Sequence, residues 1–310
     1  MKNKVILALY ILISSANLAL ATGDTPALDP NRFGAKVEDD AFGAYQRGLY
    51  RTALDLALIR AKDGDAAAQT LAAEIYSRGL GVPLNPKEAT RLYGLAADQG
   101  VIEAQFQMAL ILLDGKYAPK DEVKAKSYLE KAVAAGHALA GFNLAQLILS
   151  TATTDVQRKA AFDLFLKAAL AGLPDAQYAV GQYLANGTAG VPLDEVKARG
   201  WMEKAARQNY DTAQLDLGNW MIAGKGGKKD YETGFLWMKR AAESGTVEAQ
   251  RVLARLYYDG VGTKGDSISG AAWYIIAKRS GLHDPYMDDV LDGLDDSELK
   301  KAIELANRLK

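Results

Sequence analysis

Apolar and small residues recur along this chain in six similar segments of about 36 residues. In each segment an alanine is followed by an apolar residue four positions later, and by a second apolar residue four positions after that. The spacing i, i+4, i+8 defines one face of an α-helix. The alanines are Ala68, Ala104, Ala140, Ala176, Ala213 and Ala249. A second periodic stretch follows in every segment, so each segment predicts two consecutive helices, named A and B below.

The turn after each B helix repeats with the same period. Five of its six intervals are 36 residues long, and the interval that ends at Asn209 has 37. One helix pair cannot bury its apolar face alone, so a fixed period of this size predicts that neighbouring pairs stack. We therefore expect an all-α fold, a right-handed α-solenoid of stacked antiparallel helix pairs. Such a stack forms a long surface rather than a deep pocket, which argues against an enzyme.

One position in every A helix holds a small residue. Alanine or glycine there lets the backbones of the A and B helices approach closely, although glycine costs about 1 kcal/mol of helix propensity. A large side chain at this position should destabilise the pair by about 1–3 kcal/mol. The residues are Ala73, Ala109, Ala145, Gly181, Gly218 and Ala254.

The loop between the A and B helices carries glycine and often proline, and an Asn or Asp then caps the B helix. The third repeat departs from this pattern. Its loop, Ser150–Thr154, has neither glycine nor proline, and Gln157 stands where the other repeats have the capping residue. Sequence drift and a contour required by a partner are both open interpretations of this loop.

The ends of the array are less regular, as terminal repeats tend to be. Residues 41–64 predict an amino-terminal cap, a tetratricopeptide-like half repeat, and residues 65–281 hold the six repeats. Residues 282–310 predict a carboxy-terminal cap that ends in an amphipathic helix. Asp296 or Ser297 is expected to cap this helix. Its expected inner face consists of Leu299, Ile303, Ala306 and Leu309.

Residues 1–21 have the pattern of a signal peptide. Lys2 and Lys4 precede a short apolar run, and Ala19 and Ala21 supply the small residues that a signal peptidase requires. We expect cleavage before Thr22, a flexible leader over residues 22–40, and a periplasmic product, with secretion as an alternative. An uncleaved anchor or a buried first helix would be the competing interpretation.

Composition excludes several kinds of chemistry. The chain has no cysteine, which removes disulfides, thiolate zinc sites and a cysteine nucleophile. Its 37 basic and 38 acidic side chains show no basic stripe of the kind that binds nucleic acid. No further apolar run is long enough to cross a membrane. His137 and His283 lie in turns without a nucleophile or metal ligand nearby in sequence, so we expect no catalytic residue, no metal and no cofactor.

The repeats resemble the Sel-one-like repeat (SLR) family of the tetratricopeptide-like superfamily, and in particular its exported bacterial members. The resemblance covers residues 41–310. The signature is legible in Ala176-Gln177, Gly187–Val191, Asp194, Ala198, Trp201–Ala206, Trp237–Ala242, Ala249-Gln250, Tyr257, Gly260–Gly262 and Asp266. It implies a protein-interaction module, in some members an adaptor or regulator of envelope signalling. A cysteine-rich branch of the family is linked to penicillin binding and hydrolysis, an activity that does not carry over to a chain without cysteine.

In tetratricopeptide-like solenoids the A helices line a concave face. Aromatic, amide and arginine side chains there suit a protein or peptide partner. The expected partner-binding residues are Phe106, Phe142, Tyr178, Gln146, Gln182, Asn219, Arg251 and Arg255. Packing of Phe106, Phe142 and Tyr178 between neighbouring A helices is an equally open interpretation. The amides are the stronger candidates, because amides gain little from burial.

Three functions compete at this point. The first is an exported, non-enzymatic scaffold that binds protein or peptide on its concave face as an adaptor or regulator of envelope signalling. The second is an envelope hydrolase, related to β-lactams or peptidoglycan, of the cysteine-rich type. The third is a secreted factor that engages a host molecule.

Overall fold

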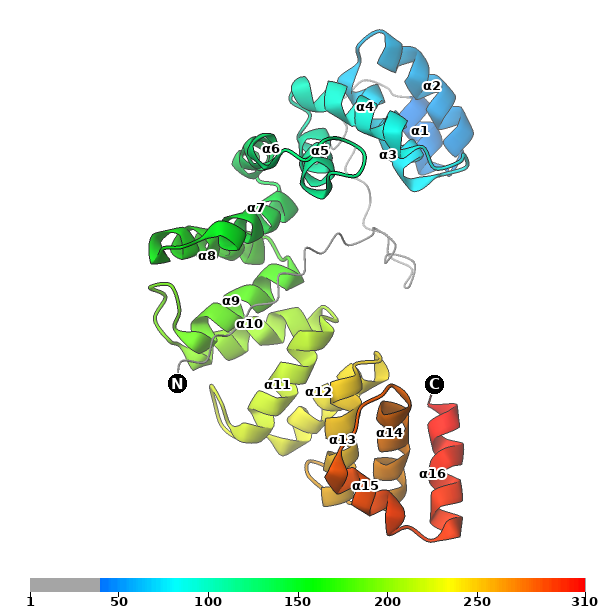
Figure 1. Cartoon of the computed structure of the whole chain (residues 1–310), viewed down its shortest axis with the longest axis vertical. Helices are drawn as coiled ribbons and strands as arrows, with labels where there is room; N and C mark the ends of the chain where they lie inside the picture. Colours follow the sequence, from blue (N-terminus) through cyan, green and yellow to red (C-terminus); the bar gives the residue numbers. More distant parts are fainter. Residues whose placement is uncertain (1–39, 310) are drawn as a thin grey trace. The chain divides into compact units, whose positions relative to one another are not determined.

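The computed structural model describes residues 40–309, which form sixteen α-helices and, over that range, no strand. The chain divides into two compact units, Met1–Thr153 and Thr154–Lys310. The predicted signal peptide and the predicted leader up to residue 39 lie outside the described residues. Within the first unit the helices are α1 (Asp40–Gln46), α2 (Tyr50–Lys62), α3 (Ala66–Arg78), α4 (Pro86–Asp98), α5 (Ile102–Asp114), α6 (Glu122–Ala134) and α7 (Ala138–Thr151) (Figure 1).

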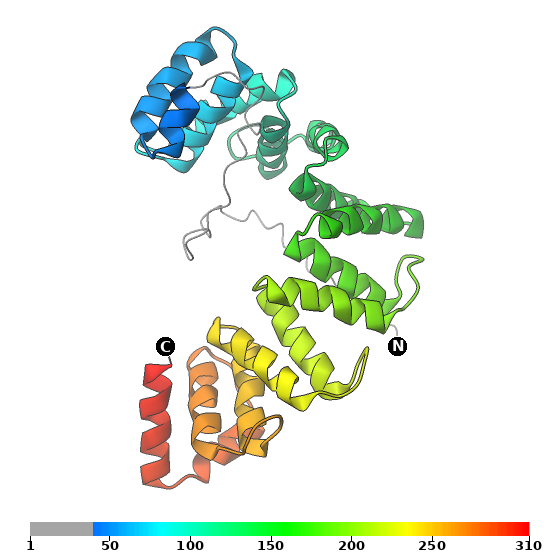
Figure 2. The same cartoon turned by 180° about the vertical axis from the view of Figure 1, so that it is seen from behind.

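The second unit contains the remaining nine described helices. They are α8 (Asp155–Leu170), α9 (Pro174–Asn186), α10 (Glu195–Arg207), α11 (Asp211–Ala223), α12 (Tyr231–Glu243), α13 (Val247–Asp259), α14 (Ser267–Arg279), α15 (Pro285–Asp292) and α16 (Asp296–Arg308). Helices α9, α11 and α13 are A helices, and α8, α10, α12 and α14 are B helices. Figures 1 and 2 show from opposite sides that α13, α14 and α16 lie side by side. The helical content and the pairing of successive helices confirm the expected all-α class of stacked antiparallel helix pairs.

Close contact between A and B helices explains the small residue in every A helix. A β-carbon added to Gly218 of α11 would lie 3.0 Å from the carbonyl oxygen of Gly234 in α12 and 3.2 Å from Met238. At Gly181 of α9 it would lie 3.1 Å from Met202. The alanines at this position in the other repeats are fully buried. The predicted role of the small position is therefore confirmed.

The second glycine of the interhelix loop has a separate structural role. Gly262, in the loop between α13 and α14, has a φ of 72°, and a β-carbon there would collide with the carbonyl oxygen of Tyr231 at the start of α12. Gly226, in the loop between α11 and α12, would collide in the same way with the carbonyl oxygen of Glu195 in α10. Glycine at these positions lets each loop rest on the amino terminus of the preceding B helix.

The third repeat differs from the prediction at its B helix. Helix α8 has 16 residues, compared with 13 in the other B helices, and begins one turn earlier. Thr154, and not Gln157, is the N-cap. The Thr154 hydroxyl oxygen accepts a hydrogen bond from the backbone N–H of Gln157. In return, Oε1 of Gln157 accepts one from the backbone N–H of Thr154, which completes a capping box. The division between the two compact units falls in this loop, between Thr153 and Thr154.

The carboxy-terminal helix also departs from the expectation. Asp295 caps α16, so the prediction of Asp296 or Ser297 is wrong by one or two residues. Ala302 and Ala306 form its buried face. Ile303 and Leu309 were expected on that face, but each is 39% exposed. Small residues face α14 here because, as within the repeats, they allow two helix backbones to approach.

Candidate functional site

A buried glutamine at the start of nearly every repeat holds the A helix against the preceding B helix. In each case the side-chain amide nitrogen donates to the carbonyl oxygen eight residues earlier, at 3.1–3.3 Å. These carbonyls belong to the last turns of the B helices, and each also accepts from the backbone N–H three residues later, in the turn that follows the helix. The glutamines are Gln69, Gln105, Gln177, Gln214 and Gln250. They fix where each A helix begins, and therefore which of its side chains face outward.

Of the expected contact residues in the first unit, Phe106 lies in the core. Its side chain is 5% exposed, and its ring centroid is 4.5 Å from that of His137. His137 is a turn residue, as predicted. Its Nδ1 accepts from the Ala140 amide at the start of α7, which leaves Nε2 to donate to Glu103 at 3.3 Å. Packing between helices, one of the two open interpretations, therefore describes Phe106.

Phe142 and Gln146 lie on α7 and are both partly buried. They stay expected contacts of the first unit.

In the second unit, Tyr178 and Gln182 of α9 meet Asp216 of α11. The Tyr178 hydroxyl donates to Oδ2 of Asp216 at 2.8 Å, and Nε2 of Gln182 donates to the same oxygen at 2.9 Å. Gln182 also donates to the Tyr178 hydroxyl at 2.7 Å. The ring of Tyr210, which precedes α11, lies 5.2 Å from that of Tyr178. Sequence reasoning found Tyr178 and Gln182 but missed Asp216 and Tyr210.

All four of these residues are partly exposed, and Asn219, one turn further along α11, is exposed. Asp175, also partly exposed, lies in the first turn of α9. We call the set Asp175, Tyr178, Gln182, Tyr210, Asp216 and Asn219 the α9–α11 surface. It brings together three of the expected contact residues.

Electrostatics distinguish this surface from an ordinary solvated one. Burial, reinforced by Asp216, raises the pKa of Tyr178, so its hydroxyl stays protonated and acts as a donor. Burial and the nearby Asp175 raise the pKa of Tyr210 to about 12. Burial also raises the pKa of Asp175, because its ionised form is partly desolvated. The surface therefore holds carboxylates beside neutral phenols.

Arg251 and Arg255 of α13 are already bound within the chain. Asp284, the N-cap of α15, is 2% exposed and accepts from Arg251 at 3.1 Å and from Nε of Arg255 at 2.7 Å. Arg251 also pairs with Glu248. Hydrogen bonds from Arg255 and then Arg251 lower the pKa of Asp284 to about 2. The carboxylate of Asp284 is therefore buried between two arginines.

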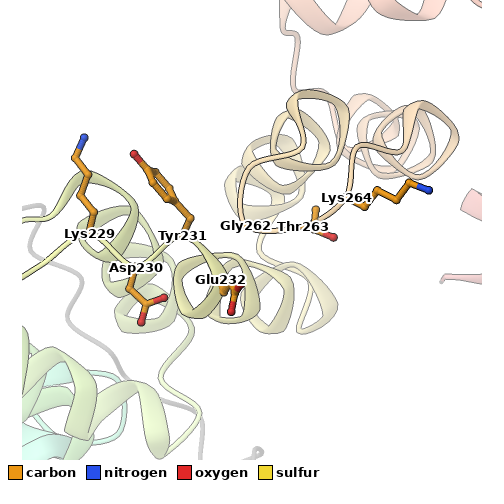
Figure 3. A pocket seen from close by; sticks show the side chains of 7 residues that line it. All are labelled: Lys229, Asp230, Tyr231, Glu232, Gly262, Thr263 and Lys264. Carbon is orange, nitrogen blue, oxygen red and sulfur yellow. The ribbon is translucent and has the colours of Figure 1, made fainter.

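One hollow of the second unit lies between the start of α12 and the loop that follows α13 (Figure 3). It is lined by Lys229, Asp230, Tyr231, Glu232, Gly262, Thr263 and Lys264. The side chains of Lys229 and Lys264 point away from each other, and no polar groups converge on a common point. Over residues 40–309 no group of three His, Cys, Asp or Glu side chains is arranged to hold a metal ion. No helix in the same range combines the length and apolar character needed to cross a membrane.

Comparison with known proteins gives consistent matches. The Sel1 repeat family model matches six segments, residues 66–101, 102–137, 142–173, 174–210, 212–246 and 247–282. Sel1 repeats typically act as protein-interaction modules, and proteins built from them are generally non-catalytic scaffolds.

Solved structures of the same fold include the following two. A protective antigen of uropathogenic Escherichia coli with an SLR fold has a TM-score of 0.74 at 26% identity, over 87% of this chain and 61% of that one. A Sel1 repeat protein from Oxalobacter formigenes has a TM-score of 0.66 at 27% identity, over 79% of this chain and 97% of that one.

Among curated proteins, chitin synthase regulatory factor 3 of Schizosaccharomyces pombe is 28% identical over 183 residues. The match covers 56% of this chain but only 19% of that protein.

Proposed function

Because this chain belongs to the Sel1 repeat family, we propose that it is a non-catalytic scaffold that binds a protein or peptide segment on the α9–α11 surface. The observation that carries the proposal is the hydrogen-bonded group of Tyr178, Gln182 and Asp216, which presents oriented polar atoms and aromatic rings on an open surface. Amides and carboxylates of this kind pair with backbone or side-chain groups of a partner, while tyrosines supply contact area. Phe142 and Gln146 are proposed as separate contacts on α7 of the first unit.

The arginines contribute less directly to this proposal. Arg251 and Arg255 are bound to Asp284, so a partner would have to compete with a buried carboxylate for them. Phe106 contributes to packing alone, because its ring is buried. The proposed contact surface therefore includes fewer residues than the repeat register predicted.

We also propose that the chain is exported to the periplasm and acts there as an adaptor or regulator of envelope signalling. The proposal rests on the signal-peptide pattern of residues 1–21 and on the family's association with protein interaction. The comparisons do not favour the envelope hydrolase or the host-interaction factor. Amino-terminal sequencing of the protein recovered from cell fractions would test export, with Thr22 as the expected first residue.

The test of the binding surface is capture of partners from an envelope extract by the immobilised chain. Gln182→Arg should weaken capture, because its longer side chain covers the surface and forms an ion pair with Asp216. The melting temperature should not fall, since Gln182 is only partly buried. Leu236→Arg is the matched control, because Leu236 lies on the B helix α12 and is 60% exposed. Equal capture by both variants and the unmodified chain would contradict the proposed surface.

A further inference from the structure

Charge is distributed unevenly between the A and B helices of the second unit. Helices α9 and α11 contain three acidic residues, Asp175, Asp211 and Asp216, and no lysine or arginine. Helix α10 lies between α9 and α11 in the sequence and contacts both of them. It has four basic and two acidic residues. The basic residues are Lys197, Arg199, Lys204 and Arg207. Negative charge is therefore concentrated on the A helices that form the α9–α11 surface.

These acidic groups have no cation of their own. Within residues 40–309, no ion pair includes Asp175, Asp211 or Asp216. In α13 of the same unit, by contrast, Glu248 pairs with Arg251. The two hydrogen bonds to Asp216 come from neutral groups, the Tyr178 hydroxyl and the Gln182 amide, and both reach the same oxygen, Oδ2. They hold the carboxylate in one orientation and leave its charge uncompensated.

Aromatic rings stand beside these carboxylates. Tyr178 and Tyr210 are partly exposed, with centroids 5.2 Å apart, and Tyr178 touches Asp216 through its hydroxyl. A cation placed near a carboxylate and over a tyrosine ring gains from both interactions. Elsewhere in this unit the chain pairs rings with its own cations, as where Lys204 lies 3.9 Å from the ring centroid of Trp201. On the α9–α11 surface neither α9 nor α11 supplies such a cation.

We propose that the occupant of the α9–α11 surface is a basic protein segment, with an arginine or lysine side chain seated against Asp216 and the rings of Tyr178 and Tyr210. This inference rests on the proposed function and names the partner chemistry of the same surface. Charge complementarity carries it: the two carboxylates of this surface, Asp175 and Asp216, form no ion pair within the described residues, so they attract a cationic segment and repel an acidic one. A seated cation would also relieve the cost of keeping Asp175 ionised in its partly desolvated position.

The test is a selection of random displayed peptides on the immobilised chain, without any assumption about the natural partner. Selected peptides are then measured by equilibrium binding to the unmodified chain, to Gln182→Arg, and to a double variant, Asp175→Asn with Asp216→Asn. The matched control is Asp155→Asn with Asp163→Asn. It removes the same charge from exposed positions of α8 in the same unit.

We expect lysine and arginine to be enriched among the selected peptides. Their affinity should fall about tenfold in the Asp175 and Asp216 variant and by less than about twofold in the control. Binding should also weaken with added salt. Selected peptides that bind this surface, as shown by loss of binding in Gln182→Arg, but have no basic enrichment would overturn the charge inference and leave the proposed function standing. Peptides whose binding is unaffected by Gln182→Arg would overturn both.

Discussion

Helix α11 holds Leu215 and Asn219 at the two outward A-helix positions where α13, 36 residues later, holds Arg251 and Arg255. Around α11 the nearby carboxylate, Asp216, is bound only by neutral donors. Around α13 the carboxylate of Asp284 is buried between both arginines. The repeat register therefore fixes which positions face outward, but residues of the neighbouring elements decide whether the side chains there are available. At the α13–α15 end, opposite charges pair with each other and stabilise the fold. On the α9–α11 surface, the carboxylate of Asp216 has no cationic partner within the described residues.

Of the substitutions that test this comparison, Asp284→Asn should change the free energy of unfolding most. It removes the charge that neutralises Arg251 and Arg255, and loss of one partner from a buried ion pair is strongly destabilising. Because the arginine side chains are 24% and 40% exposed, water can solvate them in part, and we expect a loss of about 2–4 kcal/mol. Urea unfolding followed by tryptophan fluorescence measures it.

The pH dependence of this loss has a definite sign. The folded-state pKa of Asp284 is lowered to about 2, below an unfolded value of about 3.9. Its contribution is therefore fully present above the unfolded pKa and is lost as the pH falls through about 2. The gap between Asp284→Asn and the unmodified chain should close over that window. Asp289→Asn, at an exposed position of α15, is the control, and an equal loss there would contradict the role of the buried pair.

Ser244→Gln should strengthen the junction between α11 and α13. At the α9–α11 junction, Nε2 of Gln208 donates to Oε1 of Gln177 at 2.8 Å. Over the described residues, Oε1 of Gln214 is buried without a hydrogen-bond partner, and Ser244 stands at the position 30 residues later. A glutamine there should satisfy this oxygen and stabilise the fold by about 1 kcal/mol.

A double-mutant cycle isolates that hydrogen bond. The gain from Ser244→Gln should disappear when Gln214→Leu is present, because the acceptor is then missing. A gain of the same size in both backgrounds would mean that the new side chain acts through another contact.

Asp175→Asn should have the smallest effect and the opposite sign to Asp284→Asn. Its folded-state pKa is raised by burial, so its ionisation lowers stability as the pH rises through that pKa. Near neutral pH the amide should therefore stabilise the chain slightly, on the order of 0.5 kcal/mol. Thermal unfolding at neutral pH and well below pH 4 tests this, with the gain expected only at neutral pH. Destabilisation at neutral pH would mean that Asp175 has an unrecognised partner.

The fold was largely predictable from the sequence because its signals are local and repeated. The helix pairs follow from apolar spacing, and the small A-helix position follows from contact between backbones, as Gly218 against Gly234 shows. The start of α8 was not predictable from the repeat register, because Thr154 forms a capping box one turn before the expected position. The buried face of α16 was predictable only in part: Ala306 was expected there, but close packing on α14 also selects Ala302 over the larger Ile303 and Leu309.

The candidate site was predictable only in part. Register placed Tyr178, Gln182 and Asn219 on the outward side of the A helices, as the structure does. It could not reveal that Tyr178 and Gln182 converge on Asp216, because that contact joins residues 38 and 34 positions apart. Nor could it show that Asp284 forms ion pairs with Arg251 and Arg255, since Asp284 lies outside the repeats. The absence of lysine and arginine from α9 and α11 was the one readable signal of the acidic surface.

The most direct test of the central claim is photo-crosslinking from a single position on each side of the second unit. A photoreactive phenylalanine analogue at Asn219 reports on the α9–α11 surface, and the same analogue at Leu236 reports on the B helix α12; both side chains are exposed. In an envelope extract we expect a crosslinked partner from position 219 that is lost when Asp175→Asn and Asp216→Asn are added. A partner crosslinked from position 236 and not from position 219 would contradict the account.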